Sequence, residues 1–323
     1  MYKIIFRRSL EACLTLFMAT LIIFLLTYFA PGDPIELLLN NHAEIALTNT
    51  EAYQEKVASL RAEWGLDQNL IVQYVSWIKQ LLQLDLGNSL HTGRLISVEI
   101  AERLPATIAL SVVSLILQIV LGMLLGIVSA LHSGRWLDHL IRVICAVFSS
   151  LPGFVIGLVS LSLFAVMFNI YEISNDASLS RIWLPAVILG VISAPQLIRV
   201  VRASMLSEFG KLYVASALSR GLVSKHLVRH VLRNCWLPVI TVIALSLTSL
   251  ISGAVVIETI FSWPGIGKYA LDSILVKDYA VIKGYAFIMV ALVIIINLII
   301  DLLYTLVDPR LNRKGAVIFE KSE

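Results

Sequence analysis

The chain contains long runs without a single Asp, Glu, Lys or Arg, and these runs restrict its fold more than any other feature. A helix of about 20 apolar residues crosses a hydrocarbon core roughly 30 Å thick. With 58% hydrophobic and 15% charged residues, the chain is far more apolar than an ordinary soluble protein. We therefore predict an all-α integral membrane protein with six transmembrane helices. The uncharged runs cover residues 12–32, 104–134, 143–171, 182–198, 234–257 and 284–300.

The fourth run, residues 182–198, is the weakest of the six candidates, with 17 residues and two prolines. As a helix it rises only about 25 Å. Pro185 and Pro195 predict kinks in it, and Arg199 and Arg202 follow directly. We expect these two arginines to extend their charged ends toward the membrane surface.

The distribution of Lys and Arg predicts the orientation, because cytoplasmic segments carry an excess of these residues. With the N-terminus inside, the cytoplasmic segments hold most of the 25 Lys and Arg residues. Both termini are therefore predicted to be cytoplasmic. The expected organisation is a cytoplasmic N-terminus with the first helix (1–30), an extracytoplasmic helical subdomain (31–103), a five-helix core (104–310) with a cytoplasmic loop at 199–234, and a cytoplasmic tail (311–323).

The predicted extracytoplasmic subdomain contains one clear amphipathic pattern. Leu70, Tyr74, Trp77, Ile78 and Leu81 recur at helical spacing. An apolar stripe with two aromatic side chains is typical of a helix that lies along a membrane interface.

The loop at 199–234 predicts two short helices. From residue 209 to 220, Phe209, Tyr213 and Ala217 recur every four residues and share one face, and Gly221 is placed to end this helix in a left-handed conformation. Beyond it, a second helix is predicted with an apolar stripe and a basic face. The stripe contains Val223, Leu227, Val228, Val231 and Leu232, and the basic face contains Lys225, Arg229 and Arg233.

This basic hairpin has several interpretations. Recognition of DNA is disfavoured because both neighbours are predicted membrane spans and a third helix is missing. His226 and His230 have the i, i+4 spacing of a metal pair, but the loop offers no third ligand, so we interpret them as solvated. Two interpretations stay open: a helix that rests on anionic lipid, and a docking element for a soluble partner, which we favour.

The predicted span cores lack the residue sets that catalysis needs. All six histidines lie outside the cores, and no Ser/His or paired-Asp set occurs inside them. Residues 265–269 (GIGKY) contain a Gly-Lys pair, but Ser262 and Tyr269 replace the Gly and the Ser/Thr of a phosphate-binding loop. We therefore predict no catalytic, cofactor-binding or metal-binding residues. Any energy for transport has to arrive through another subunit.

Several motifs resemble one known family, the permeases of binding-protein-dependent ABC importers, in the dipeptide, oligopeptide and nickel branch. Residues 213–221 (YVASALSRG), followed by 229–234 (RHVLRN) and Leu237-Pro238, resemble the cytoplasmic "EAA" loop of that family. The resemblance covers nearly the whole chain. Further similar motifs are residues 66–68 (LDQ), 85–89 (DLGNS), 103–107 (RLPAT), 258–267 (ETIFSWPGIG), 277–279 (KDY) and 308–310 (DPR).

The chain also departs from the family pattern. Ala215 stands where the family motif has Glu, and Ser216 stands where it has its first Ala, so we expect no contact that depends on that carboxylate. Residues 151–154 (LPGF) resemble the proline kink of the branch, but Val155 stands where many relatives carry Trp.

The resemblance implies the architecture of a type I ABC importer permease in the bacterial inner membrane. The implied partners are a second homologous permease subunit, two cytosolic ABC ATPase subunits or domains that bind the ATP, and an extracytoplasmic substrate-binding protein. By position, the helix that ends at Gly221 is implied to be the coupling helix that docks on the ATPase. Its implied contacts are Tyr213, Ala217, Arg220 and Gly221.

The implied substrates are short peptides or nickel and other metal chelates, moved by alternating access. Polar residues inside the spans are candidates to line the path, although Ser and Thr in spans also serve helix packing. We select Gln118, Ser246, Ser249 and Asn297. Two other functions remain as alternatives: a stand-alone secondary carrier, and a membrane scaffold whose basic loop binds lipid.

Residues 258–267 lie at the end of the fifth run and are expected to form an extracellular turn. Pro and Gly in such a turn favour a structural role, with docking of a binding protein second. For Glu258 we expect a capping or interface contact rather than a proton relay.

Overall fold

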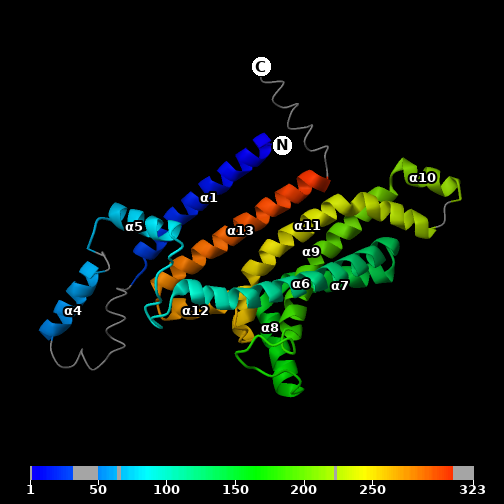
Figure 1. The fold of residues 1–323 in the computed structure, drawn as a ribbon. Helices are drawn as coiled ribbons and strands as arrows, with labels where there is room; N and C mark the ends of the chain where they lie inside the picture. The colour runs from blue at the N-terminus through cyan, green and yellow to red at the C-terminus, as the bar shows by residue number, and fades with distance from the viewer. Residues whose placement is uncertain (1, 32–49, 64–66, 222–223, 308–323) are drawn as a thin grey trace. The chain divides into compact units, whose positions relative to one another are not determined.

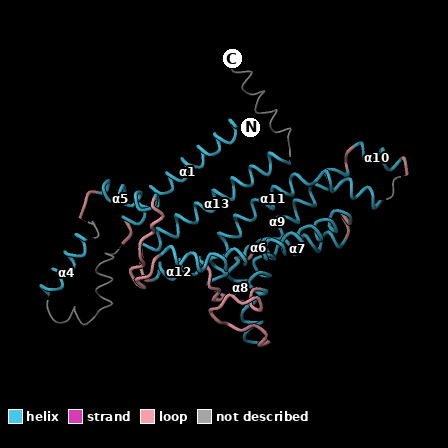
Figure 2. Tube along the Cα trace, in the orientation of Figure 1, coloured by secondary structure: helices cyan, strands magenta, loops and turns pink. Residues whose placement is uncertain are grey.

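The structure is a computed structural model that describes residues 2–31, 50–63, 67–221 and 224–307, and the predicted tail at 311–323 lies outside these residues. Apart from an isolated antiparallel bridge between Asn88 and Leu95, the regular elements of the described residues are helices (Figures 1 and 2). The chain forms two compact units. One contains Met1–Arg103 and Tyr269–Glu323, and the other contains Leu104–Lys268.

Five of the described helices are long and apolar enough to cross a membrane, and a bent pair makes a sixth span if it counts as one. This agrees with the predicted six spans. The five are α1 (Tyr2–Tyr28), α6 (Ile96–Leu131), α9 (Trp183–Phe209), α11 (Ser224–Ile260) and α13 (Tyr279–Val307).

The bent pair corresponds to the third predicted span. It consists of α7 (Trp136–Ser150) and a second segment at Gly153–Met167, made of α8 (Gly153–Leu161) and a π-helical stretch, with a bend of 97° between them. Leu151 is extended, with φ −86° and ψ 134°, because a residue before proline is driven out of the helical region. The kink expected at residues 151–154 is therefore confirmed, and it is a break in the helix.

The fourth span is longer than its uncharged run. α9 continues without interruption through Pro195, Arg199 and Arg202 to Phe209. It packs against α7 and α11, which belong to the same unit (Figure 1). The two arginines that were expected to follow the span are therefore part of its helix.

Small residues allow α6 to approach α9 closely. A Cβ atom added at Gly126 of α6 would lie 2.7 Å from the Cβ atom of Val201 and 3.1 Å from the carbonyl oxygen of Ile198. Such contacts are shorter than van der Waals packing permits, so only glycine fits here. Close packing of this kind is how membrane helices associate when lipid is as apolar as their side chains.

In the other unit, α5 (Leu70–Leu82) carries the predicted apolar stripe. Its Trp77 and Leu81 are buried in a cluster with Phe24 of α1, and Phe287 of α13 packs against the same cluster. The Tyr74 hydroxyl also lies 3.0 Å from the hydroxyl of Thr20 on α1. The stripe is therefore confirmed, and the helices of its own unit cover it.

Two of the resembling motifs meet in this unit. The Ser89 hydroxyl donates a hydrogen bond to the carboxylate of Asp278 at 2.7 Å, and the same carboxylate accepts the backbone N–H of Val281 in the first turn of α13 at 3.3 Å. Asp278 is buried. The motifs at residues 85–89 and 277–279 are thus two halves of one packing contact that holds the start of α13.

The motif at residues 258–267 is also structural. The buried Glu258 carboxylate accepts hydrogen bonds from the hydroxyl of Thr107 at 2.5 Å and from the backbone N–H groups of Gly267 and Lys268 at 2.8 and 3.0 Å. Gly267 and Lys268 lie in the first turn of α12 (Ile266–Leu275), whose N–H groups have no partner within the helix. The expected capping role of Glu258 is therefore confirmed.

Candidate functional site

The basic loop forms a short helix, α10 (Leu212–Ser219), between α9 and α11. We predicted one helix over residues 209–220, and this boundary is wrong: Phe209 is the last residue of α9, and Lys211 is extended with φ −81° and ψ 149°. Phe209 therefore does not share a face with Tyr213. The second predicted helix is not separate either, because α11 runs from Ser224 through the membrane span to Ile260.

The turn after α10 agrees with the sequence prediction. Gly221 has φ +76°, and its N–H donates a hydrogen bond to the carbonyl oxygen of Leu218 at 2.9 Å. This left-handed conformation is accessible to glycine at no steric cost and is unfavourable for a residue with a Cβ atom. The chain can therefore reverse at this point and enter α11.

Apolar packing fixes one side of α10. Val214 is 3% exposed and lies in a buried cluster with Met205 of α9 and Val231 of α11, and Ala217 packs against the same cluster. The start of α11 contributes its predicted stripe, since Leu227 and Val231 are buried whereas Arg229 and Arg233 are exposed. Val223 and the side chain of Lys225 lie outside the described residues.

A polar cluster holds the N-terminal end of α10, where the chain turns from α9 into α10. The Glu208 carboxylate on α9 accepts hydrogen bonds from the hydroxyl of Tyr213 at 2.9 Å, from the ammonium group of Lys211, and from the amide of Asn234 on α11 at 3.4 Å. The Asn234 amide also donates to the Tyr213 hydroxyl at 3.0 Å. Three consecutive helices therefore share one nearly buried carboxylate.

The Glu208 carboxylate affects the pKa values of its two neighbours, Lys211 and Tyr213. The hydrogen bond to Glu208 raises the pKa of Lys211. Burial is the main cause that raises the pKa of the Tyr213 hydroxyl, and its hydrogen bond to Glu208 adds to the effect. Tyr213 therefore keeps its proton at neutral pH and acts as a donor to the carboxylate.

Sequence reasoning missed Glu208 and Lys211. One signal for Glu208 was present, because it is the single acidic residue of the basic loop at 199–234. Its position three residues before Lys211 and five before Tyr213 does not predict the contacts, since these depend on the turn between α9 and α10.

The outward side of α10 exposes apolar side chains next to a basic one. Leu212 and Leu218 are 87% and 53% exposed. Tyr213 is partly exposed, and Arg220 and Gly221 are exposed at the end of the helix. Exposed leucines beside polar residues on an ordered short helix are typical of a protein interaction surface. Of the four predicted contact residues, Ala217 alone faces mainly inward.

The four candidates for the path lie in different surroundings. Gln118 of α6 and Ser246 of α11 are buried, and the Gln118 amide donates hydrogen bonds to the Ser246 hydroxyl at 2.8 Å and to the Ser193 carbonyl oxygen at 3.2 Å. Ser249 is exposed on α11, and Asn297 is exposed on α13 of the other unit. The structure brings two of the four together, and their role in a path stays a prediction.

The described residues contain no group of three His, Cys, Asp or Glu side chains placed to hold a metal ion. His226 and His230 are both exposed on α11.

Two family models match the chain. The model described as "Binding-protein-dependent transport system inner membrane component" matches residues 122–313. The corresponding N-terminal membrane component matches residues 1–111. Between them they cover most of both compact units and include α10.

Similar curated proteins match along almost their full length. A probable D,D-dipeptide transport system permease of Escherichia coli is 33% identical and covers 91% of this chain and 93% of its own. A probable peptide ABC transporter permease of Sinorhizobium fredii is 33% identical, with 95% and 98% covered. A glutathione transport system permease of Salmonella paratyphi A is 31% identical, with 97% and 100% covered.

Among solved structures, a chain of the inward-facing MetNI methionine ABC transporter superposes with a TM-score of 0.53 at 17% identity. The match covers 65% of this chain and 96% of that one. At this identity the likeness concerns the fold. The two family matches over residues 1–111 and 122–313 show that the chain belongs to the inner membrane component family of binding-protein-dependent transport systems.

Proposed function

We propose that this permease imports short peptides and that α10 is the element through which separate ATPase subunits move it. As a member of its family, the chain is a non-catalytic, multi-pass subunit of the inner membrane, and ATP hydrolysis belongs to partner subunits. The observation that carries the proposal for α10 is its double attachment: the Glu208 cluster and the packing of Val214 tie it to both α9 and α11.

This attachment allows force to pass from α10 into the membrane spans. α9 ends at Phe209 and α11 is one continuous helix from Ser224 to Ile260. A displacement of α10 would therefore shift both helices together, and α11 carries the shift as far as Ser246 and Glu258. Alternation between outward-open and inward-open forms of the permease follows if ATP drives that displacement.

The proposed assembly contains a second homologous permease, two cytosolic ATPase subunits and an extracytoplasmic substrate-binding protein. Both termini and α10 are cytoplasmic in this proposal, in line with the excess of Lys and Arg in those segments. The exposed Leu212 and Leu218 would be covered by the ATPase, which explains why a short helix outside the spans keeps two leucines on its surface. The chain binds no cofactor of its own and no nucleic acid.

Peptides are the substrate class that the relatives favour, since their names include peptide, D,D-dipeptide and glutathione permeases. The same family matches favour an importer subunit over the stand-alone carrier and the lipid-binding scaffold. Import of nickel or another metal chelate is the remaining alternative for the substrate.

Co-purification with the ATPase tests the role of α10. Gly221→Val places a β-branched residue at φ +76° and is expected to abolish co-purification while the chain still inserts into the membrane. Gly210→Val is a matched control, because a Cβ atom at Gly210 stays 3.6 Å from its nearest neighbour. Equal co-purification of both variants would contradict the proposal.

Uptake assays test the substrate. In a deletion strain, the full chain is expected to restore accumulation of radiolabelled di- and tripeptides and not of nickel. The reverse result would assign the permease to metal chelates.

A further inference from the structure

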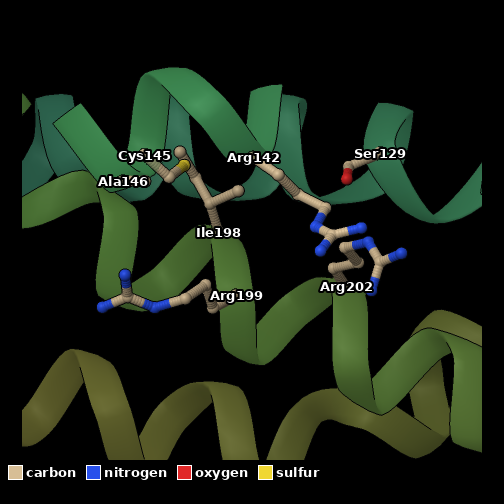
Figure 3. Close-up of a pocket in the computed structure, with 7 residues that line it drawn as sticks. All are labelled: Ser129, Arg142, Cys145, Ala146, Ile198, Arg199 and Arg202. Carbon is tan, nitrogen blue, oxygen red and sulfur yellow. The ribbon is translucent and has the colours of Figure 1, made fainter. Parts of the chain in front are cut away.

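α6, α7 and α9 line an open cavity of about 380 Å³, and its lining includes three arginines (Figure 3). Arg142 comes from α7, and Arg199 and Arg202 come from α9. Ser129 of α6 and Cys145 of α7 complete its polar lining. Three guanidinium groups around one cavity in a membrane-spanning region require a source of negative charge.

One carboxylate supplies part of that charge. Asp138 is 1% exposed and forms two hydrogen bonds with the Arg202 guanidinium, at 2.7 and 2.8 Å. It also accepts hydrogen bonds from the Ser129 hydroxyl at 2.6 Å and from the Gly134 N–H at 3.1 Å. Asp138 is thus fully engaged with Arg202 and with its own neighbours.

The other two arginines, Arg142 and Arg199, are exposed. In the part of the chain that the structure describes, no carboxylate forms an ion pair with Arg142 or Arg199. Arg199 donates a hydrogen bond to the hydroxyl of Ser149 at 3.0 Å. Figure 3 shows Arg142 and Arg202 extending from facing helices toward the same part of the cavity, whereas Arg199 extends in another direction. Asp138 balances the charge of Arg202, so Arg142 is the group of this converging pair that an additional anion would neutralise.

The cavity lies on the α10 side of its unit. The end of α6 shares a buried cluster with α10, through Ala130 and Val214, and α7 begins immediately after the turn that follows α6. Arg202 is seven residues before the end of α9, which is about 10 Å along a helix. Arg142 is six residues after the start of α7, or about 9 Å. Both guanidinium groups are therefore within reach of a lipid headgroup.

The surface of α7 beside the cavity is apolar. Val143 and Val147 are exposed by 59% and 48%, and the helical spacing places them on the flank of α7 next to Arg142 and Ala146, which line the cavity. Acyl chains fit against such a surface, and a soluble anion gains nothing from it.

We propose that this cavity binds the phosphodiester headgroup of an anionic phospholipid from the leaflet on the α10 side, which the proposed orientation makes the inner leaflet. Arg142 and Arg202 hold the phosphate between α7 and α9, Arg199 provides additional positive charge, and one acyl chain lies along Val143 and Val147. Guanidinium groups donate paired hydrogen bonds to phosphate oxygens, which suits them to this role. Since α9 leads directly into α10, the lipid binds the helix that carries the proposed docking element.

Lipid retention tests the site. The full-length chain, together with the subunits that purify with it, is reconstituted in nanodiscs of phosphatidylcholine and phosphatidylglycerol. The protein is then released from the nanodiscs, and the lipid that stays bound to it is measured by native mass spectrometry. The double variant Arg142→Gln/Arg199→Gln is expected to bind phosphatidylglycerol roughly thirtyfold more weakly than the unchanged chain. Arg135→Gln/Arg229→Gln is the matched control, because it also removes two exposed charges but neither residue lines the cavity, and it is expected to retain the lipid.

Each other result overturns the proposal. Equal retention by all three proteins, or equal loss from both double variants, would mean that the cavity is not a lipid site. Protection of the chain against thermal unfolding by inorganic phosphate, without retained phosphatidylglycerol, would assign the cavity to a soluble anion. The single variant Arg142→Lys separates folding from binding. It keeps the positive charge at this position and is expected to retain most of the lipid that the unchanged chain binds. Because the readout is bound lipid, it is independent of peptide uptake and of ATPase co-purification.

Discussion

The hydroxyl of Tyr213 on α10 donates a hydrogen bond to the carboxylate of Glu208 on α9, across the turn that separates the two helices, at 2.9 Å. The same carboxylate accepts a hydrogen bond from Asn234 on α11. A tyrosine of the family-like motif is therefore oriented by an acid outside that motif. The motif's own acidic position is Ala215 in this chain, so Glu208 provides the only carboxylate of the loop.

Loss of the Glu208 carboxylate is expected to loosen α10. Glu208→Ala leaves Tyr213, Lys211 and Asn234 without their shared acceptor, at a cost of about 1 to 3 kcal/mol. Hydrogen exchange of the α10 amides is expected to become faster, and peptide uptake is expected to fall. Tyr213→Phe removes one donor and keeps the carboxylate, so a smaller change is expected. Unchanged exchange in Glu208→Ala would show that apolar packing alone holds α10.

The turn before α12 is expected to tolerate no side chain at Gly265. A Cβ atom there would overlap the Glu258 carboxylate, which is buried and caps α12. Gly265→Ala is expected to destabilise the full chain by about 3 kcal/mol or more, through strain and loss of the cap. Gly253→Ala on α11 is the control, because its Cβ atom would lie 3.9 Å from the nearest atom. Thermal unfolding in detergent compares the two, and similar midpoints would contradict the overlap.

The ion pair between Asp138 and Arg202 is expected to be essential for joining α7 to α9. Asp138→Asn leaves the Arg202 guanidinium with no ion-pair partner among the described residues, and breaking a buried pair on one side costs about 3 to 5 kcal/mol. Arg202→Lys keeps the charge and loses the paired hydrogen bonds, so a smaller loss of stability is expected. The yield and melting temperature of the full chain are the measurements. An Asn variant as stable as the unchanged chain would refute the role of the pair.

Alkaline stability is expected to depend on Tyr269. Burial, with smaller effects from Glu99 and Asp278, raises the pKa of Tyr269 to about 12, whereas a free tyrosine has a pKa near 10. The folded state holds this proton more tightly than the unfolded state does. The contribution of the neutral hydroxyl to folding stability is therefore complete below about pH 10 and is lost as the pH rises toward 12. Among the described residues its buried hydroxyl has no hydrogen-bond partner. Tyr269→Phe is therefore expected to keep stability at neutral pH and to lessen the alkaline loss, which unfolding curves across this pH range would measure.

Local sequence determined the features that depend on single segments. Uncharged runs predicted the six spans, because whether a helix fits the bilayer depends on its own composition and length. The stripe on α5 and the left-handed Gly221 were predictable for the same reason, since each follows from spacing or from one residue's backbone freedom. Of the candidate contacts on α10, Tyr213, Arg220 and Gly221 were found from a motif, and the structure leaves them accessible.

Tertiary structure alone decided which distant residues meet. The sequence spacing between Glu208 and Asn234, between Asp138 and Arg202, or between Thr107 and Glu258 contains no periodic signal, because each pair joins different helices whose approach depends on packing. The extension of α9 through Arg202 also depends on packing: the carboxylate of Asp138 on α7 pairs with the Arg202 guanidinium, so the helix continues where the apolar run ends.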